Sequence, residues 1–320
     1  MKIFFIEYVL GYTTYSSKAA EAGNFIHKSM EILALIKKAK QDGKSQIDEL
    51  GMGSFIVNDY NLDDIFKKSC DFYLKKSPNI YIEKDFKIYR NWFTKALEYK
   101  SGLYNPINRE IVGVEKSFDI TFEDDWAKYE YELHEEKYIG QYSIKGNVDI
   151  IIKESKNILE LIDYKTGARK DWLTGKKKEY NDFLKDPQLL IYYYALAHLY
   201  PDKDIIISIF YINDGGVFSV PFDRTRLPSI KDMLRKRFEK IKTTKLPKLL
   251  SPSRKDFKCY RLCHAYKTMV GDKTLCEYIH NEIRLKGIHK ATEDNIKKGF
   301  DFRAYADGGG STGLKEKDLK

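Results

Sequence analysis

The 320-residue sequence is poor in the residues and patterns that mark secreted and membrane proteins. It contains four cysteines, which are too few for a disulfide framework. No run of about 18 apolar residues is present, so we expect no transmembrane helix. Glu7 interrupts the short apolar stretch that follows Met1 and Lys2, and no small-residue cleavage site comes after it, so we expect no signal peptide. These absences favour a cytoplasmic protein without a membrane partner.

The sequence also lacks internal repeats and the phosphate-binding pattern Gly-x-x-x-x-Gly-Lys, so any ATP-driven motor that acts with this protein would be a separate chain. Hydrophobic residues make up 42% and aromatic residues 14%, which excludes a disordered chain. Lysine and arginine outnumber aspartate and glutamate by 56 to 47, giving a net charge of +9. A basic balance favours polyanionic partners such as nucleic acid, although many basic proteins bind none.

Apolar spacing predicts a sequence of helices and strands along the chain. We expect helices at 18–40, 184–200 and 226–242, and strands at 111–120, 138–152, 158–164, 204–213 and 217–222. Asn213-Asp214-Gly215-Gly216 predicts a turn between the last two strands. The order of these elements indicates an α/β protein with a central mixed sheet flanked by helices.

The same patterns divide the chain into five parts. We expect an N-terminal helical part at 1–43, a helical insertion at 44–110 with helices near 61–76 and 84–99, a core at 111–250, a cysteine-containing segment at 251–300 and a flexible glycine-rich tail at 301–320.

One carboxylate lies inside an apolar expected strand, and a second carboxylate and a lysine lie at the end of the next strand. Asp149 lies in Gly-Asn-Val-Asp-Ile, and Asp163 and Lys165 lie in Leu-Ile-Asp-Tyr-Lys-Thr-Gly. Asp163 and Lys165 are two residues apart and therefore leave the same face of a strand. If the two strands pair as a hairpin, both carboxylates converge, and their repulsion is relieved by a divalent cation with a preference for oxygen ligands, Mg²⁺ or Mn²⁺. The alternative is a solvated hairpin with ordinary surface charges.

Residues on both sides of this cluster extend the pattern. Gly23 and His27 form Gly-x-x-x-His on the first helix, and Gln188 and Tyr192 form Gln-x-x-x-Tyr on the helix after the lysine. Taken alone, His27 is compatible with a histidine packed in the core or on the surface, and Tyr192 with a buried aromatic stripe. Together with Asp149 and Asp163-Tyr164-Lys165, these residues resemble the PD-(D/E)XK nuclease superfamily, and in particular its RecB-like exonuclease branch.

The resemblance implies a restriction-endonuclease-like fold and a role for each matching residue. It implies that Mg²⁺ or Mn²⁺ binds to His27, Asp149, Asp163 and the carbonyl of Tyr164, and that Lys165 positions water and the scissile phosphate. It further implies that Gln188 and Tyr192 orient the substrate. Glu115, on the first expected strand, matches an acidic residue common in the branch and is a possible neighbour of the metal site.

A basic loop follows the lysine strand and carries candidate DNA-binding residues. These are Arg169, Lys170, Trp172, Lys176, Lys177 and Lys178. Lysine and arginine neutralise phosphates, and tryptophan stacks on bases. The alternative is a solvated charged loop with Trp172 packed beneath it. The basic helix around Arg235 is a second such surface, although charge runs on helices are usually solvated faces.

Three cysteines gather near the C-terminus, and Cys70 stands apart from them. Cys259, Cys263 and Cys276 resemble the later cysteines of the four-cysteine 4Fe–4S cluster found in RecB-like and CRISPR-associated nucleases. With His280 they also have zinc-like spacing, so Zn²⁺ is a second interpretation, and three reduced thiols in a packed segment are a third.

The sequence thus predicts a metal-dependent DNA exonuclease that hydrolyses phosphodiester bonds in DNA repair, recombination or phage-type DNA processing. The expected partners are DNA and a helicase or recombination protein. Two alternatives remain, a non-catalytic DNA-binding protein on a nuclease scaffold and an endonuclease subunit of a recombination complex.

Overall fold

The computed structural model describes residues 18–75, 77, 79–133, 136–171 and 174–243, and towards the C-terminus residues 259, 263, 266, 269–287, 290, 291, 293 and 294. The chain divides into two compact units, Ser17–Lys242 and a second unit made of Met1–Ser16 and Thr243–Lys320. Every residue of the expected nuclease site belongs to the first unit.

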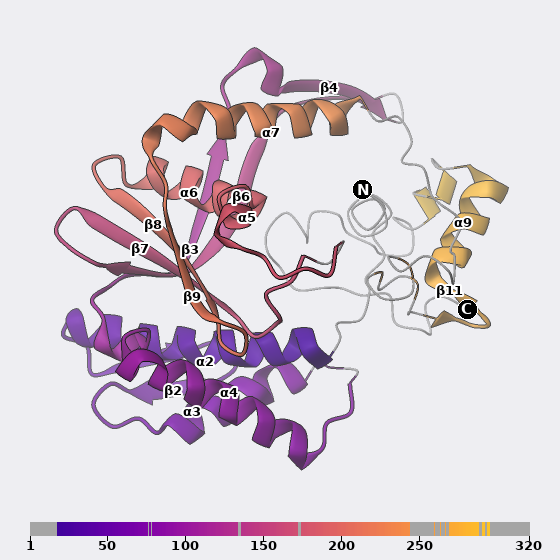
Figure 1. The fold of residues 1–320 in the computed structure, drawn as a ribbon. Coiled ribbons are helices and arrows are strands. Elements are labelled where there is room, and N and C mark those ends of the chain that lie inside the picture. The colour runs from indigo at the N-terminus through magenta and orange to yellow at the C-terminus, as the bar shows by residue number, and fades with distance from the viewer. Residues whose placement is uncertain are drawn as a thin grey trace. The chain divides into compact units, whose positions relative to one another are not determined.

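A five-stranded mixed sheet forms the centre of the first unit (Figure 1). Its strands lie in the order β3-β6-β7-β8-β9, with bounds β3 Ile111–Thr121, β6 Ser143–Lys153, β7 Ile158–Lys165, β8 Asp204–Tyr211 and β9 Gly216–Pro221. Only β7 and β8 run parallel, and the other neighbouring pairs are antiparallel. β7 is buried along nearly its whole length, as expected for a central strand covered on both faces.

One face of the sheet packs against the N-terminal helices. These are α2 Lys18–Gln41, α3 Leu62–Leu74 and α4 Glu83–Gly102, joined by the short antiparallel strands β1 Gln46–Glu49 and β2 Gly53–Ile56 and the 3-10 turn η2 Pro106–Asn108. Phe25, Ile26 and Met30 of α2 are fully buried against Ile162 and Tyr164 of β7 in one hydrophobic cluster. The segment 44–110 therefore contributes to the main core beside the sheet.

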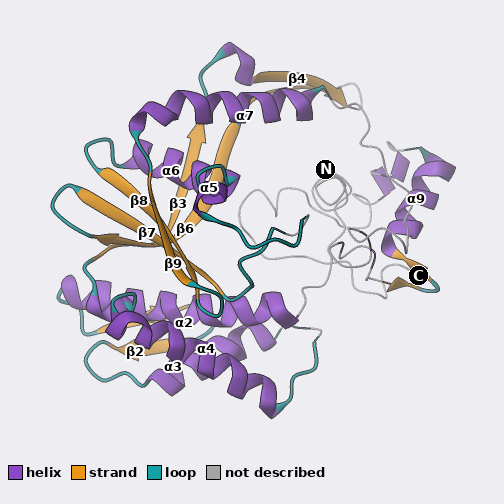
Figure 2. Ribbon diagram, viewed as in Figure 1, coloured by secondary structure: helices purple, strands orange, loops and turns teal. Residues whose placement is uncertain are grey.

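The opposite face is covered by the helices that follow β7. They are α5 Tyr180–Phe183, α6 Pro187–Leu199 and α7 Leu227–Lys242, with the 3-10 turn η4 Arg224–Arg226 before α7 (Figure 2). Tyr193 and Leu196 of α6 pack with Leu161 of β7 and Leu234 of α7 in a second hydrophobic cluster. The sheet is thus the middle of three layers, which confirms the expected α/β architecture.

Most expected elements are present with bounds shifted by a few residues. α2 matches the helix predicted at 18–40 and buries apolar side chains from Ala22 to Ala39, whereas Ala19 is exposed. Asp186 caps α6 by accepting a hydrogen bond from the Gln188 N–H at 3.0 Å, so the helix starts three residues later than predicted. The predicted turn after β8 holds Gly215 and Gly216 at positive φ, where glycine is favoured.

The single strand expected at 138–152 is wrong, because the chain changes its pairing partner at Tyr142. The residues before Tyr142 form β5 Glu136–Gln141, and the residues after it form β6. β5 pairs with β4 Lys128–Leu133, which follows the 3-10 turn η3 Asp125–Ala127. The Tyr142 N–H donates to Ala127 O at 2.9 Å, and the Tyr142 ring stacks on Phe122 and Phe238. Hydrophobic alternation continues through this junction, so the pattern alone did not reveal it.

The described part of the second unit contains β10 Met269–Val270, β11 Lys273–Thr274 and α9 Leu275–Lys286. Thr274 and Glu277 form a reciprocal capping box at the start of α9, and Gly287 ends the helix at a φ of 78°. Across the described residues of both units, none of the helices is long and apolar enough to cross a membrane.

Candidate active site

Asp149 and Asp163 lie where β6 and β7 separate. The antiparallel pairing of these strands ends at Ile150 opposite Ile162, so Asp149 and Asp163 are the next residues on each strand. Opposite residues of an antiparallel pair place their side chains on the same face, and the two carboxylates therefore lie side by side. We call this position, defined by Asp149 and Asp163, the strand fork.

Lys165 accompanies Asp163 on the same face of β7. Its Nζ lies 2.8 Å from Oδ2 and 3.0 Å from Oδ1 of Asp163. The Asp163 side chain is 3% exposed. Burial raises the pKa of Asp163 above its ordinary value, Lys165 opposes this effect, and the charge of Asp149 adds to it. The strand thus holds a desolvated carboxylate whose nearest counter-charge is the lysine two residues away.

His27 reaches the fork from α2. Its Nδ1 lies 3.1 Å from Asp149 Oδ2. Burial alone would lower the pKa of His27, but the close contact with Asp149 and the charges of Asp149 and Asp163 outweigh it, so the pKa of His27 is raised. Gly23, one helical turn earlier, lies against the residue after Lys165: a Cβ added there would be 3.3 Å from Thr166 Oγ1. The glycine therefore allows α2 to approach the end of β7 closely.

Two carboxylate oxygens at the fork fit a divalent cation. Asp149 Oδ2 and Asp163 Oδ2 are buried, and neither accepts a hydrogen bond of good geometry from the described residues. The Tyr164 carbonyl also faces the fork: Lys165 O accepts from Ile212 N on the β8 side at 3.0 Å, and successive carbonyls of a strand point to opposite edges. Hard oxygen donors of this kind suit Mg²⁺ or Mn²⁺.

The described side chains do not form a complete set of metal ligands. In the part of the chain that the structure describes, no three His, Cys, Asp or Glu side chains are grouped closely enough to hold a metal ion. His27 and Lys165 are paired with the two aspartates instead. Lys165, and His27 when it is protonated, offset the charge that a divalent cation would offset on binding.

Glu115 lies opposite Asp149 across the β3–β6 pair, between the partners Val114–Ile150 and Lys116–Val148. It adopts a φ of 45°, a left-handed conformation that is costly for a residue with a side chain. Burial raises the pKa of Glu115 to about 7, and the charges of Asp149 and Glu31 add to this. The predicted neighbour of the metal site is therefore placed beside Asp149 in a strained conformation.

A group of charges on α2 lies next to His27 and was not predicted as functional. Lys28, which is buried, pairs with Glu31 at 2.8 Å and with Glu49 of β1 at 2.7 Å. Burial raises the pKa of Glu31 despite its pairing with Lys28. The only signal in the sequence is the helical spacing of Lys28 and Glu31 around His27, and the contact with Glu49 is long-range.

Gln188 and Tyr192 form one turn on α6. Gln188 Nε2 donates to the Tyr192 hydroxyl at 2.8 Å. Burial raises the pKa of Tyr192, and the next contribution is the charge of Asp163, which indicates that this tyrosine faces the fork. Tyr193 and Tyr194 are buried in the core, and Tyr192 is partly buried against the same hydrophobic cluster.

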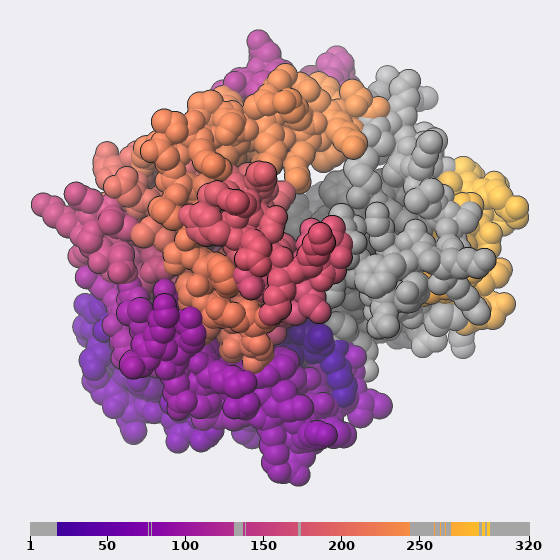
Figure 3. Space-filling model, viewed as in Figure 1, coloured from indigo at the N-terminus to yellow at the C-terminus, as the bar shows by residue number. Residues whose placement is uncertain are grey.

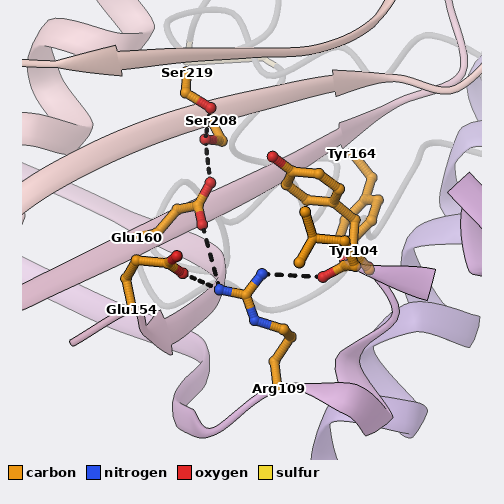
Figure 4. Close-up of polar contacts among 8 residues, drawn as sticks. Tyr104, Arg109, Glu154, Glu160, Tyr164, Ser208 and Ser219 are labelled. Carbon is orange, nitrogen blue, oxygen red and sulfur yellow. Dashed lines mark hydrogen bonds and ion pairs between the residues drawn. The ribbon is translucent and has the colours of Figure 1, made fainter. Parts of the chain in front are cut away.

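A buried polar network lies on the other face of β7 and was also missed (Figure 4). Glu160 accepts a hydrogen bond from Ser208 Oγ, and Ser208 Oγ lies 2.7 Å from Ser219 Oγ. The Oε2 atom of Glu160 lies 3.8 Å from Arg109 Nη2. Arg109 also pairs with Glu154. The network joins β7, β8 and β9 to the segment before β3. Its sequence signal is Glu160, a charge within the apolar run from Ile158 to Ile162.

The basic loop is folded, and its predicted DNA-binding residues differ in placement. Arg169 is largely covered, with its guanidinium over the Phe218 ring at 4.4 Å. Lys177 and Lys178 are paired with aspartates, whereas Lys170 and Lys176 are exposed. Trp172 lies outside the described residues. On α7, Arg235 is paired within its own helix.

The structure does not support the expected iron–sulfur or zinc site. Cys259, Cys263 and Cys276 are buried and form no disulfide, and no metal-binding group of side chains includes them among the described residues. Cys70 is buried in the helical layer of the first unit, where burial raises its thiol pKa to about 12.

A mixed sheet that presents a buried and a half-buried carboxylate and a lysine at a strand fork fits a metal-dependent nuclease, because a divalent cation held there would stabilise charge on a phosphate. A family model described as the PD-(D/E)XK nuclease superfamily matches residues 2–267. The chain belongs to the PD-(D/E)XK nuclease superfamily. No curated protein matches the chain.

Proposed function

We propose that this protein is a Mg²⁺- or Mn²⁺-dependent deoxyribonuclease of the RecB-like branch that degrades DNA from its ends. One observation carries the proposal: two opposed aspartates lie beside a lysine at the strand fork, and the buried Oδ2 atom of each has only an ion-pair contact, with His27 or Lys165, and no hydrogen bond of good geometry from the described residues. Buried acceptors normally have partners, so this arrangement supports a site for a cation. Gly23 and His27 on α2, with Gln188 and Tyr192 on α6, support the RecB-like branch.

Each residue of the site has a role in this proposal. Asp149, Asp163, His27 and the Tyr164 carbonyl hold the metal ion. When bound, the metal ion lowers the pKa of water and stabilises charge that develops on the phosphate. Lys165 leaves Asp163 and positions the attacking water against the scissile phosphate, to which its charge is attracted.

The substrate-facing residues act from the opposite side of the fork. The hydrogen bond from Gln188 to Tyr192 fixes the direction of the phenol group, so that the pair orients the nucleotide next to the scissile phosphate. Glu115 adds negative charge beside Asp149 and strengthens cation binding. We place the protein in DNA repair, recombination or phage-type DNA processing.

The test compares end-labelled linear DNA with a closed circle, in single- and double-stranded form, with Mg²⁺, Mn²⁺ or chelator. Wild type, Asp163→Asn and Lys165→Ala are compared with Lys153→Ala, which removes an exposed lysine at the far end of β6. We expect metal-dependent degradation of linear DNA that is lost in the first two variants and kept in the third. A Lys165→Ala protein as active as wild type refutes the mechanism, and cutting of the circle replaces the exonuclease with an endonuclease.

Metal binding has its own readout. Mn²⁺ raises the melting temperature of a protein that binds it in the native state, by mass action. We expect this shift in wild type and a much smaller one in Asp163→Asn.

A second candidate function is a non-catalytic DNA-binding protein on the same scaffold. It is favoured by the pairing of Lys165 with Asp163 and by the unclosed donor set among the described residues. It predicts salt-sensitive DNA binding without cleavage in either metal, and binding that survives Asp163→Asn.

A further inference from the structure

The loop that follows β7 is held by hydrogen bonds between its two sides. We call residues 168–178 the basic arm, and its described residues fold back on one another: Asp171 N–H donates to Lys176 O at 2.8 Å and Lys178 N–H to Arg169 O at 3.0 Å. The backbones of Lys170 and Lys177 form an isolated antiparallel β-bridge between the two sides of the arm. The arm is the loop between β7 and α5 in Figure 2, and its first residue is three positions beyond Lys165.

Asp214, in the turn between β8 and β9, fixes both sides of the arm. Its carboxylate accepts from the Arg169 backbone N–H at 2.9 Å and from Lys177 Nζ at 2.8 Å. The Arg169 guanidinium lies over Phe218 of β9 and donates from Nη1 to Lys178 O at 2.7 Å. Arg169 and Lys177 therefore hold the arm in place, and their charges are engaged within the protein.

Asp186 provides a second attachment, at the start of α6. Lys178 Nζ lies 2.7 Å from Asp186 Oδ2, and Asp186 Oδ1 accepts a hydrogen bond from the Gln188 N–H. The carboxylate that caps α6 thus also binds the arm. This contact connects the arm to the helix that carries Gln188 and Tyr192.

Contacts of charged side chains hold the described residues of the arm. Ordering each residue costs about 1–2 kcal/mol of backbone entropy, and the contacts to Asp214, Asp186 and Phe218 offset part of this cost. The arm contains five basic residues and one acidic residue, and its described residues form part of the surface seen in Figure 3.

Lys170 and Lys176 are the charges of the arm that remain available. Both are exposed, and neither has an ion-pair partner in the described part of the chain. Lys170 is five residues from Lys165, a distance of at most about 17 Å along an extended chain. One strand of B-form DNA spans the same distance in about five nucleotides.

We propose that Lys170 and Lys176 bind phosphates of the DNA strand within about five nucleotides of the scissile phosphate, on an arm positioned by Arg169, Lys177 and Lys178. The inference deepens the proposed function, because it concerns the substrate of that site. It divides the basic residues of the loop into two that contact DNA and three that support the arm.

The test is a salt titration of single-stranded DNA binding, followed by fluorescence anisotropy of a labelled oligonucleotide with chelator present. The double variant Lys170→Ala/Lys176→Ala is compared with Lys67→Ala/Lys87→Ala, which removes two exposed lysines from α3 and α4 and changes the net charge equally. Loss of two contacts reduces the slope of log K against log salt by about 1.4. If wild type and the double variant bind DNA equally at 1 M salt, this difference in slope makes binding by the variant ~25-fold weaker at 0.1 M salt.

The outcomes separate this inference from the proposed function. We expect the arm variant to show the reduced slope, and to degrade linear DNA with a higher KM and an unchanged kcat. A slope equal to that of wild type, or the same reduction in the α3/α4 control, overturns the inference even if DNA is degraded. A reduced slope in a protein that cleaves no DNA supports the arm and refutes the nuclease.

Discussion

Glu115 makes the stability of this protein depend on pH in a direction that can be tested by one substitution. Its carboxyl group lies beside Asp149, and burial is the main reason that its pKa is raised from 4.5 to about 7. Glu115→Gln keeps the shape of the side chain and removes its charge. The folded wild type must ionise this group near two other carboxylates, and the variant need not.

The direction and the size of this effect on stability follow from how many protons the folded and the unfolded chain bind. Between pH 4.5 and about 7 the folded protein holds a proton on Glu115 that the unfolded chain has released, so wild-type stability falls as pH rises. The full shift corresponds to about 3 kcal/mol at 1.36 kcal/mol per pKa unit. Because the group is only partly buried, solvent screening reduces the expected effect to about 1–2 kcal/mol.

The assay is urea unfolding at a series of pH values from 4 to about 8, with chelator present so that no cation offsets the repulsion. We expect Glu115→Gln to match wild type near pH 4 and to be more stable by about 1–2 kcal/mol above pH 7. Glu98→Gln, on the exposed side of α4, is the control and should show no such difference. A Glu115→Gln advantage that is constant with pH, or largest in acid, refutes the reasoning.

Two further substitutions probe how the site is held. Gly23→Ala gains about 1 kcal/mol of helix propensity but places a Cβ 3.3 Å from Thr166 Oγ1, so we expect the stability in urea to be nearly unchanged. We expect the rate of DNA degradation to fall, and Thr166→Ala in the same chain to restore it. An unchanged rate in Gly23→Ala would contradict this. Arg109→Ala leaves Glu160 buried without its cation and should cost about 3–5 kcal/mol in unfolding experiments. Arg109→Met/Glu160→Gln, which removes both charges, should recover most of that loss, and equal losses would show that packing alone matters.

Local patterns predicted the fold class and most elements. The turn glycines after β8, the apolar stripe of α2 and the spacing of Asp163 and Lys165 all reflect interactions between residues close in sequence. The prediction failed at Tyr142, where the hydrophobic alternation is continuous but the strand pairing changes. Strand pairing depends on partners far away in the chain, in this case Ala127 and Phe238.

The sequence by itself determined which chemical groups are available: two aspartates and a lysine on strand residues, a histidine one turn after Gly23, and a basic loop. Only the tertiary structure decided how they are used. It placed Asp149 opposite Asp163 where β6 and β7 part, put Glu115 beside them in a strained conformation, and turned Arg169, Lys177 and Lys178 towards Phe218, Asp214 and Asp186. Charge and residue type are local properties, whereas burial and ion pairing arise only when distant segments pack together.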